Sequence, residues 1–389
     1  MDTTQAEDVM HQLLRLMKER GGSDLFITAG FAPAIKFSGK LTPMSTQTLS
    51  ADDTAQLVEA LMNPRQRSEF ATSHECNFAV SPHDIGRFRV SAFVQQSKAG
   101  MVVRTITTDI PDIDALGVPP ALKELVMAKR GLVIMVGATG SGKSTTLAAM
   151  IGHRNAHSYG HIITIEDPIE YVHPHKNCLI TQREIGTDTL DWHTALKNTL
   201  RQAPDVILIG EIRDRETMDH AIAFAETGHL CLATLHANNS NQAIDRIINF
   251  FPEERRQQLL MDLSLNLKGM ISQRLIPKKS GDGRCAAVEI MLNSSLIADL
   301  IFKGDVHQIK EVMKKSREIG MQTFDQALFD LAEADQISYE DALRNADSLN
   351  DLRLALKLHG KDSRDRNLAS GTEGLEIICS SHPTSAVKP

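Results

Sequence analysis

Hydrophobic and polar residues follow two different periods along this chain, and the changes of period mark its parts. Residues 4–20 place apolar side chains at helical spacing, and Gly21-Gly22 ends the predicted helix. A second helical pattern covers residues 51–62. Strand-like runs surround it at 24–28, 34–37, 76–80, 86–94 and 101–106. This order predicts a small α+β domain over residues 1–107.

A proline-punctuated stretch, residues 108–120, follows this domain and is predicted to be a linker. Beyond it, helical patterns alternate with strand-like runs at 131–137, 162–166, 205–210 and 230–235. Such alternation predicts an α/β core over residues 121–291, built on a parallel sheet that helices cover on both faces.

The C-terminal part of the chain is predicted to be wholly helical, over residues 292–360. Two Ser-x-x-Asp stretches in it, starting at Ser338 and Ser348, have the form of helix N-caps. Residues 361–389 are poor in apolar side chains and rich in Ser, Asp and Gly, which predicts a disordered tail.

The composition of the 389-residue chain is that of a two-domain globular protein, with 42% hydrophobic and 23% charged residues. Its net charge of −7 argues against a nucleic-acid coat or a polybasic membrane anchor. No apolar run reaches the roughly 18 residues of a membrane span, and the acidic N-terminus lacks a signal-peptide pattern. The cysteines form no C-x-x-C pair, which indicates a reducing compartment without structural zinc and predicts small buried side chains at Cys76, Cys178, Cys231, Cys285 and Cys379.

One strand-like run leads directly into a phosphate-binding pattern. Residues 132–136 suit a buried strand, Gly137 to Ser144 read G-x-x-x-x-G-K-S, and a helical pattern follows. The loop amides and the helix N-terminus would face a phosphate chain, Lys143 would reach the β- and γ-phosphates, and the Ser144 hydroxyl would bind Mg²⁺. The sequence therefore predicts a nucleoside triphosphate site with Mg²⁺, formed by Gly137, Thr139, Gly140, Ser141, Gly142, Lys143, Ser144 and Thr145.

Two further strand-like runs end in acidic residues at the predicted carboxyl edge of the sheet, where ligands bind in such folds. Glu211 ends one of them and is predicted to bind Mg²⁺, directly or through water. Glu166 ends the other and is the candidate for orienting and deprotonating the attacking water. Asp167 is an alternative support for the metal, and Glu170 is expected to be solvated or structural.

Two histidines bracket the strand-like run at 230–235 and therefore lie at opposite ends of it. His236, at the carboxyl edge, is predicted to sense the γ-phosphate. His229 is predicted to organise a neighbouring carboxylate or a subunit contact, and a purely structural histidine remains the alternative for it.

Three arginines in the first domain are candidates for contact with the triphosphate. Arg87 and Arg89 alternate onto one face of a predicted strand, and Arg104 interrupts a strongly apolar run. A guanidinium in such a run is costly unless it is paired, so an ion pair within the same domain is the alternative. If the arginines bind nucleotide, ATP would control the relative orientation of the two domains, as in a mechanical enzyme.

Together and in this order, these segments resemble those of the secretion-type ATPases, most closely the type IV pilus retraction ATPases of the PilT/PilU family, over roughly residues 5–355. The matching motifs are the phosphate loop, an acidic "Asp box" at 164–170, a Walker B strand ending in Gly210-Glu211 and a "His box" at 227–236. The resemblance implies an N-terminal PAS-like domain, a RecA-like ATPase domain with a helical C-terminal extension, and a hexameric ring. It also implies that Glu166 is the catalytic base, that Glu211 is the Walker B acid, and that the three arginines help to bind nucleotide.

Two departures narrow the resemblance. Assembly and secretion motors carry a four-cysteine zinc site, whereas the region between His236 and Glu289 offers only Cys285. PilT-type motors carry an AIRNLI-like helix, whereas this chain reads Leu-Ile-Ala-Asp-Leu-Ile over residues 296–301. The first departure argues against an assembly motor. The second argues against independent retraction and favours the PilU branch, whose members resemble accessory motors that act beside a PilT-type partner.

The sequence thus predicts a cytoplasmic, hexameric ATPase at the inner-membrane face of a type IV pilus machine, which assists pilus retraction and twitching motility. Expected partners are a PilT-type retraction ATPase and the inner-membrane platform protein, without direct membrane insertion. A non-hydrolysing ring component that couples a PilT-type motor remains an alternative, as does a RecA-like nucleic-acid translocase. The acidic charge balance, one Trp and three Tyr argue against nucleic acid as a partner, and no acceptor pocket for a small-molecule kinase is recognisable.

Overall fold

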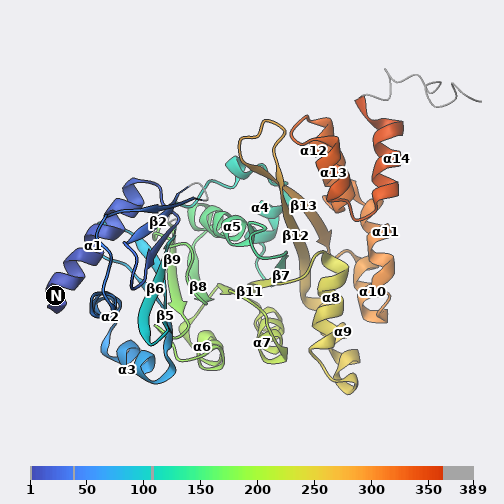
Figure 1. Ribbon diagram of the computed structural model, residues 1–389. Coiled ribbons are helices and arrows are strands. Elements are labelled where there is room, and N and C mark those ends of the chain that lie inside the picture. Colours follow the sequence, from blue (N-terminus) through green and yellow to red (C-terminus); the bar gives the residue numbers. More distant parts are fainter. Residues whose placement is uncertain (1, 38–39, 107–108, 362–389) are drawn as a thin grey trace, which may run out of the picture.

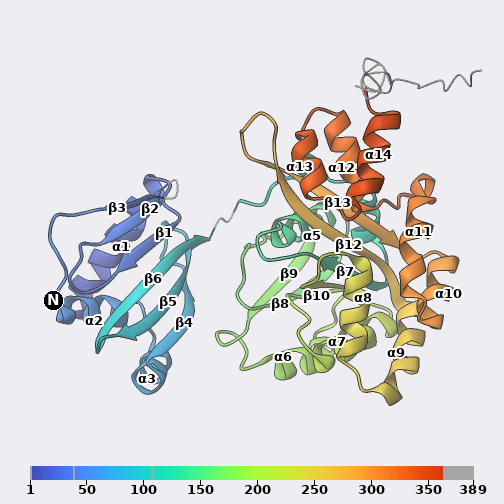
Figure 2. The same ribbon diagram turned by 45° about the vertical axis from the view of Figure 1, so that its right-hand side comes forward.

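The computed structural model of the protein describes residues 2–37, 40–106 and 109–361. The predicted tail beyond Lys361, the fifth cysteine at position 379 and the start of the predicted linker lie outside these described residues. The described chain forms two units, each built on its own β-sheet, and Figure 2 shows them side by side.

The N-terminal unit is a wholly antiparallel sheet with helices on one face. Within the described residues its strand order is β3-β2-β1-β6-β5-β4. The strands are β1 (Asp24–Ile27), β2 (Ala34–Phe37), β3 (Lys40–Pro43), β4 (Glu75–Val80), β5 (Arg87–Gln95) and β6 (Lys98–Ile106). The helices are α1 (Thr3–Glu19), α2 (Ala51–Ala60) and α3 (Pro64–Ser73), which appear in blue in Figure 1.

Apolar side chains from α1 and α2 pack against one face of this sheet. Met10 and Leu14 of α1 contact the same buried cluster as Leu25, Phe88 and Val103 of the strands. All the strands predicted for this part of the chain are present, but β3 and α3 were not predicted. β3 is an exposed edge strand and α3 buries little apolar surface, so neither carries a periodic apolar pattern.

The second unit is a mixed sheet of order β13-β12-β7-β11-β10-β8-β9 in the described chain. Its strands are β7 (Gly131–Val136), β8 (Gly160–Glu166), β9 (Cys178–Glu184), β10 (Val206–Ile209), β11 (Leu230–Leu235), β12 (Leu267–Pro277) and β13 (Arg284–Leu292). All adjacent pairs are parallel except β12 and β13, which form an antiparallel hairpin. The predicted strands are parallel, as expected, but the sheet also has an antiparallel edge strand, β13, that was not predicted. The short connection between β12 and β13 leaves no room for the crossover that a parallel pair needs.

Helices cover both faces of the second sheet, as the sequence predicts. Side chains of α4 (Ala121–Met127) and α5 (Lys143–His157) pack on one face. Side chains of α6 (Trp192–Thr199), α7 (Arg215–Glu226), α8 (Ser240–Asn249) and α9 (Glu253–Asn266) pack on the other.

The C-terminal part is helical, as predicted, and lies beside the β12–β13 hairpin in Figure 1. Its helices are α10 (Ser295–Lys303), α11 (Ile309–Lys314), α12 (Phe324–Glu333), α13 (Tyr339–Arg344) and α14 (Leu349–His359). Short 3₁₀ turns occur at several places in the described chain, namely η1 (Asp114–Leu116), η2 (Leu200–Gln202), η3 (Val306–Gln308) and η4 (Arg317–Ile319). Both predicted N-caps are confirmed, because Ser338 and Ser348 accept the backbone N–H of the residue three positions on.

The segment between the two units contacts the second of them. Ile113 is buried against the α4–α5 face of the second sheet, and Leu116 and Val118 pack beside it. Burial of these side chains fixes the later part of the predicted linker to the second unit.

Candidate functional site

The phosphate loop connects the carboxyl end of β7 to the first residue of α5. Gly142 caps α5 with a φ of +86°, a backbone conformation that favours glycine. The ammonium of Lys143 donates to the carbonyl oxygens of Gly137 at 2.7 Å and Ala138 at 2.9 Å. Burial lowers the pKa of Lys143, and the carboxylates of Glu211 and Glu170 oppose that shift. The lysine is thus held inside the loop that the sequence predicts to receive phosphates.

A buried glutamine of β12 braces this loop. The Gln273 amide donates to the Ser141 carbonyl oxygen at 2.9 Å and accepts from the Thr146 hydroxyl at 2.8 Å. The sequence analysis missed Gln273 because no strand was predicted at β12. The polar residues at 272–274 interrupt the apolar run there, and their neighbours in space come from distant parts of the chain.

A single pocket at the carboxyl edge of the second sheet brings together seven of the predicted site residues. The predicted residues in its lining are Thr139, Gly140, Lys143, Ser144, Glu166, Glu211 and His236. Other residues in its lining include Asp167, Glu170, Tyr171, His173, Trp192 and Thr234. Since parallel strands end at one edge, β7, β8, β10 and β11 deliver these side chains to the same place.

Glu166 ends β8 and is held by two side-chain hydrogen bonds. Its Oε1 accepts from the Thr164 hydroxyl at 2.6 Å and from the Gln182 amide at 3.2 Å. Burial raises the pKa of Glu166, and the charge of Glu170 raises it further. A carboxylate with a raised pKa in a pocket is suited to accepting a proton near neutral pH.

Glu211 follows β10 and lies at the centre of a charged network. Its Oε2 accepts from Arg213 Nε at 2.7 Å, and its Oε1 lies 3.2 Å from His236 Nε2. Arg213 also donates to the Asp167 carboxylate at 3.2 Å. Arg213 therefore links the acidic segment after β8 to the acidic segment after β10. The sequence analysis did not single it out, although its place two residues after Glu211 was a usable signal.

Further contacts that the sequence analysis missed support the pocket from within. The Thr145 hydroxyl lies 2.7 Å from the Tyr171 hydroxyl, which joins α5 to the segment after β8. The Thr234 hydroxyl donates to the Gly210 carbonyl oxygen, which joins β11 to β10. Burial lowers the pKa of His173 to about 4, so this imidazole is neutral at physiological pH.

His229 lies at the opposite edge of the sheet from the pocket. It directly precedes β11, and its carbonyl oxygen accepts the Gly131 N–H at the amino end of β7. Its Nδ1 lies 3.1 Å from the Thr227 hydroxyl and 3.3 Å from the Phe224 carbonyl oxygen. Within one chain His229 thus holds the α7–β11 turn and is separated from His236 by the length of β11, as its spacing predicts.

The three arginines share the face of the first sheet that lies opposite its helices. Arg104 Nε donates to the buried Asp24 carboxylate at 2.8 Å, which is the ion pair within the domain that the sequence left open. Arg87 forms an ion pair with Glu184, a buried residue at the end of β9 in the second unit. Arg89 is exposed. Among the residues that the structure describes, the pocket lining contains none of these three arginines.

Comparison with known proteins identifies the family of this chain. The family model described as "Type II/IV secretion system protein" matches residues 72–327. The chain belongs to this family. The match spans β5 and β6 with the arginines, the phosphate loop, and the carboxyl edge that carries Glu166, Glu211 and His236.

Within this secretion ATPase family, the chain is similar to pilus ATPases over nearly its whole length. It is 61% identical to the type IV pilus ATPase PilU of Pseudomonas aeruginosa over 366 residues, which cover 94% of this chain and 96% of that protein. It is 42% identical to the pilus retraction ATPase PilT of the same organism, over 86% of this chain and 97% of that protein. The chain is thus a PilT/PilU-type ATPase, an enzyme that hydrolyses ATP.

A solved structure supports the same assignment. The crystal structure of the pilus retraction motor PilT with bound ADP matches with a TM-score of 0.82 and 37% identity, over 88% of this chain and 98% of that one. The fold is therefore the α/β fold of the secretion ATPases, and the enzyme uses a nucleotide. Helices in the described part of this chain are all too short or too polar to cross a bilayer.

Proposed function

We propose that this PilT/PilU-type ATPase is a motor subunit that assists the retraction of type IV pili and so contributes to twitching motility. The observation that carries the proposal is the pocket that gathers the phosphate loop, Glu166, Glu211 and His236, in a chain 61% identical to PilU. A motor needs these groups in one pocket, because the hydrolysis of ATP must be coupled to the residues that hold the nucleotide.

Mg²⁺ is the proposed metal partner of the nucleotide. The Ser144 hydroxyl and the Glu211 carboxylate line one pocket with Lys143, and hard oxygen donors beside a phosphate loop fit Mg²⁺. When bound, Mg²⁺ neutralises charge on the phosphate oxygens. Lys143 and the loop amides would hold the β- and γ-phosphates, while Arg213 keeps the Glu211 carboxylate oriented.

Glu166 is the proposed general base. Its bonds to Thr164 and Gln182 hold one carboxylate oxygen in place, and the other oxygen would take the proton of the attacking water. His236 is the proposed sensor of the γ-phosphate, because its 3.2 Å contact with Glu211 lets it respond to charge at the pocket. His229, at the far edge of the sheet, is proposed to organise a neighbouring carboxylate or to make a subunit contact.

Arg87, Arg89 and Arg104 are proposed to supply positive charge to a triphosphate at a moment when the two units close on it. Arg87 supports this idea best, because it already reaches across to Glu184 at the end of β9, beside the β8 strand that carries Glu166. In one version of this mechanism the arginines act on the nucleotide of their own chain, and in the other they act on the nucleotide of a neighbouring chain.

The proposed architecture follows the family pattern. In this proposal residues 1–107 form a PAS-like domain, 108–120 a linker, 121–291 a RecA-like ATPase core and 292–360 a helical subdomain. The chains form a hexameric ring in the cytoplasm, at the inner-membrane face of the pilus machine. Its partners are a PilT-type retraction ATPase and the platform protein. The order of the two sheets and the helical C-terminal part support this division.

Gene deletion and complementation test the proposed function. Deletion should leave surface pili in place and reduce twitching, because assembly continues while retraction is impaired. The wild-type gene and the surface variant Lys197→Ala should restore twitching, whereas Lys143→Ala should not. Loss of surface pili on deletion would show an assembly role, and full rescue by Lys143→Ala would show that nucleotide binding is dispensable; either result overturns the proposal.

A further inference from the structure

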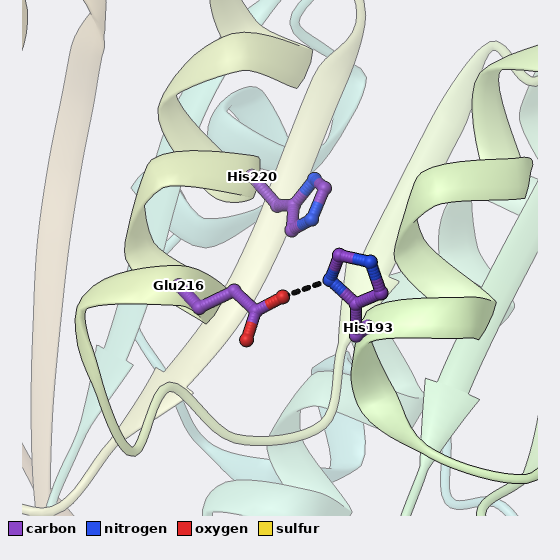
Figure 3. Close-up of side chains that lie close together, drawn as sticks. All are labelled: His193, Glu216 and His220. Atoms are coloured by element: carbon purple, nitrogen blue, oxygen red, sulfur yellow. Dashed lines mark hydrogen bonds and ion pairs between the residues drawn. The ribbon is translucent and has the colours of Figure 1, made fainter.

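Three potential metal ligands meet on the outer side of the second unit, between α6 and α7. His193 is the second residue of α6, while Glu216 and His220 lie one turn apart on α7. Figure 3 shows the two α7 side chains turned toward the His193 ring. One ligand atom from each residue lies within 4.8 Å of the other two. From this geometry we propose that His193, Glu216 and His220 form a binding site for a divalent transition-metal ion of the zinc class, separate from the nucleotide pocket.

The spacing along α7 makes two of the ligands converge. Residues four apart lie on the same face of a helix, so Glu216 and His220 present their donors side by side. His193 completes the set from α6, where its Nδ1 forms an ion pair with the Glu216 carboxylate. A tetrahedral ion with Zn–N bonds of about 2.0–2.1 Å needs donors about 3.3 Å apart. Small side-chain rotations therefore suffice to close the cluster from its present separation.

The side chains are free to make those rotations. The exposed fractions of the His193 and Glu216 side chains are 57% and 54%. His220 is half-buried, with its ring 6.3 Å from the ring of His193 and 5.9 Å from that of Phe224.

The ligand types select the metal. Two imidazoles and one carboxylate suit Zn²⁺, Co²⁺, Ni²⁺ or Cu²⁺, whereas Mg²⁺ prefers oxygen ligands alone. An exposed ion pair between His193 and Glu216 would contribute little to stability by itself, and it gives no reason for a second imidazole beside it. A metal site explains why His220 lies beside His193 and Glu216, whereas an ion pair between those two residues does not.

The helices that carry the proposed metal site connect it to the nucleotide pocket. Trp192, next to His193, lines the pocket, and α7 follows directly after the loop that carries Glu211 and Arg213. An ion held by α6 and α7 would tie the start of α6, which borders the pocket, to the start of α7, which follows the Glu211 loop. Metal occupancy would thus restrict the movement of Trp192 relative to the Glu211 loop.

Metal binding to the full-length, nucleotide-free protein tests the proposal, because ATP itself binds these ions. Protein stripped with EDTA and desalted should bind one Co²⁺ per chain, with visible absorption bands that Zn²⁺ abolishes by displacement. His193→Ala, Glu216→Gln and His220→Ala should each weaken the affinity by about tenfold or more, since even the loss of a group that only supports a ligand costs that much.

A matched control separates this site from general binding by surface histidines. His157→Ala removes an imidazole that stacks on His153 of α5, on the opposite face of the sheet, and should leave the affinity unchanged. Zn²⁺ should raise the thermal unfolding midpoint of the wild type and of His157→Ala, but not that of His193→Ala or Glu216→Gln, whose exposed side chains can be replaced without unfolding the protein. Equal Co²⁺ affinity in wild type, His193→Ala and Glu216→Gln would overturn the proposal, as would a wild type that binds no Co²⁺.

Discussion

Replacement of Glu166 by Gln provides the sharpest test of the hydrolytic chemistry. The amide is nearly the same size as the carboxylate, and its oxygen can keep the hydrogen bonds from Thr164 at 2.6 Å and Gln182 at 3.2 Å. The amide cannot accept a proton from water. The change therefore removes the proposed base while leaving the shape of the pocket and the binding of the nucleotide intact.

The size of the effect follows from the role. General-base catalysis contributes about 10²–10⁴-fold to a rate. At about 1.4 kcal/mol for each tenfold step, the loss corresponds to about 3–5 kcal/mol in the barrier to hydrolysis. Nucleotide affinity should change much less, because Lys143 and the loop amides do not depend on Glu166.

The pH dependence gives a second readout. Burial and the charge of Glu170 raise the pKa of Glu166, and only the deprotonated carboxylate can act as a base. Wild-type hydrolysis should therefore fall as the pH decreases through the raised pKa, at a higher pH than an ordinary glutamate would give. Glu170→Gln is the matched control, since it should keep most of the activity and move this fall to lower pH.

The assay is phosphate release from the purified oligomer with Mg²⁺ and its PilT-type partner, alongside the affinity for a fluorescent ATP analogue. If Glu166→Gln retains hydrolysis within a factor of about three, Glu166 is not the base. If the Glu166→Gln variant loses nucleotide binding together with hydrolysis, the Glu166 carboxylate is needed for the structure of the pocket. Either result would refute the reasoning from its hydrogen bonds and pKa.

Two further predictions concern the supports of the site. Arg87→Ala removes the charged partner of the buried Glu184 carboxylate and should destabilise the protein by about 3 kcal/mol. The double variant with Glu184→Gln should largely reverse this effect. Thermal unfolding measures both variants, and a double variant no more stable than Arg87→Ala would contradict the prediction. Gly142→Ala should abolish nucleotide binding, because its new Cβ would lie 2.7 Å from Gln273 Nε2. Gly140→Ala is the control and should only weaken binding, because no atom of the described residues, apart from its neighbours in the chain, lies within 4 Å of the added Cβ. Equal affinities of the two variants in a nucleotide titration would show that the contact with Gln273 does not matter.

Local pattern determined much of the fold. β7, β10 and β11 are buried on both faces, so their apolar runs appear in the sequence without reference to any partner. The phosphate loop is equally local, since a strand, a glycine-rich turn and a helix follow one another directly. β9 and the β12–β13 hairpin mix polar and apolar residues, and no pattern predicted them.

The sequence by itself determined the edge of the sheet at which the predicted site residues gather, because the ends of parallel strands must meet there. Only the tertiary structure decided which charged and polar groups pair. Arg104 joins Asp24 across 80 positions, Arg87 joins Glu184 across 97, and Gln273 reaches Ser141 across 132. The physical reason is that such contacts depend on strand order and helix packing, which bring distant residues together, whereas a sequence motif reports only on residues that are neighbours along the chain.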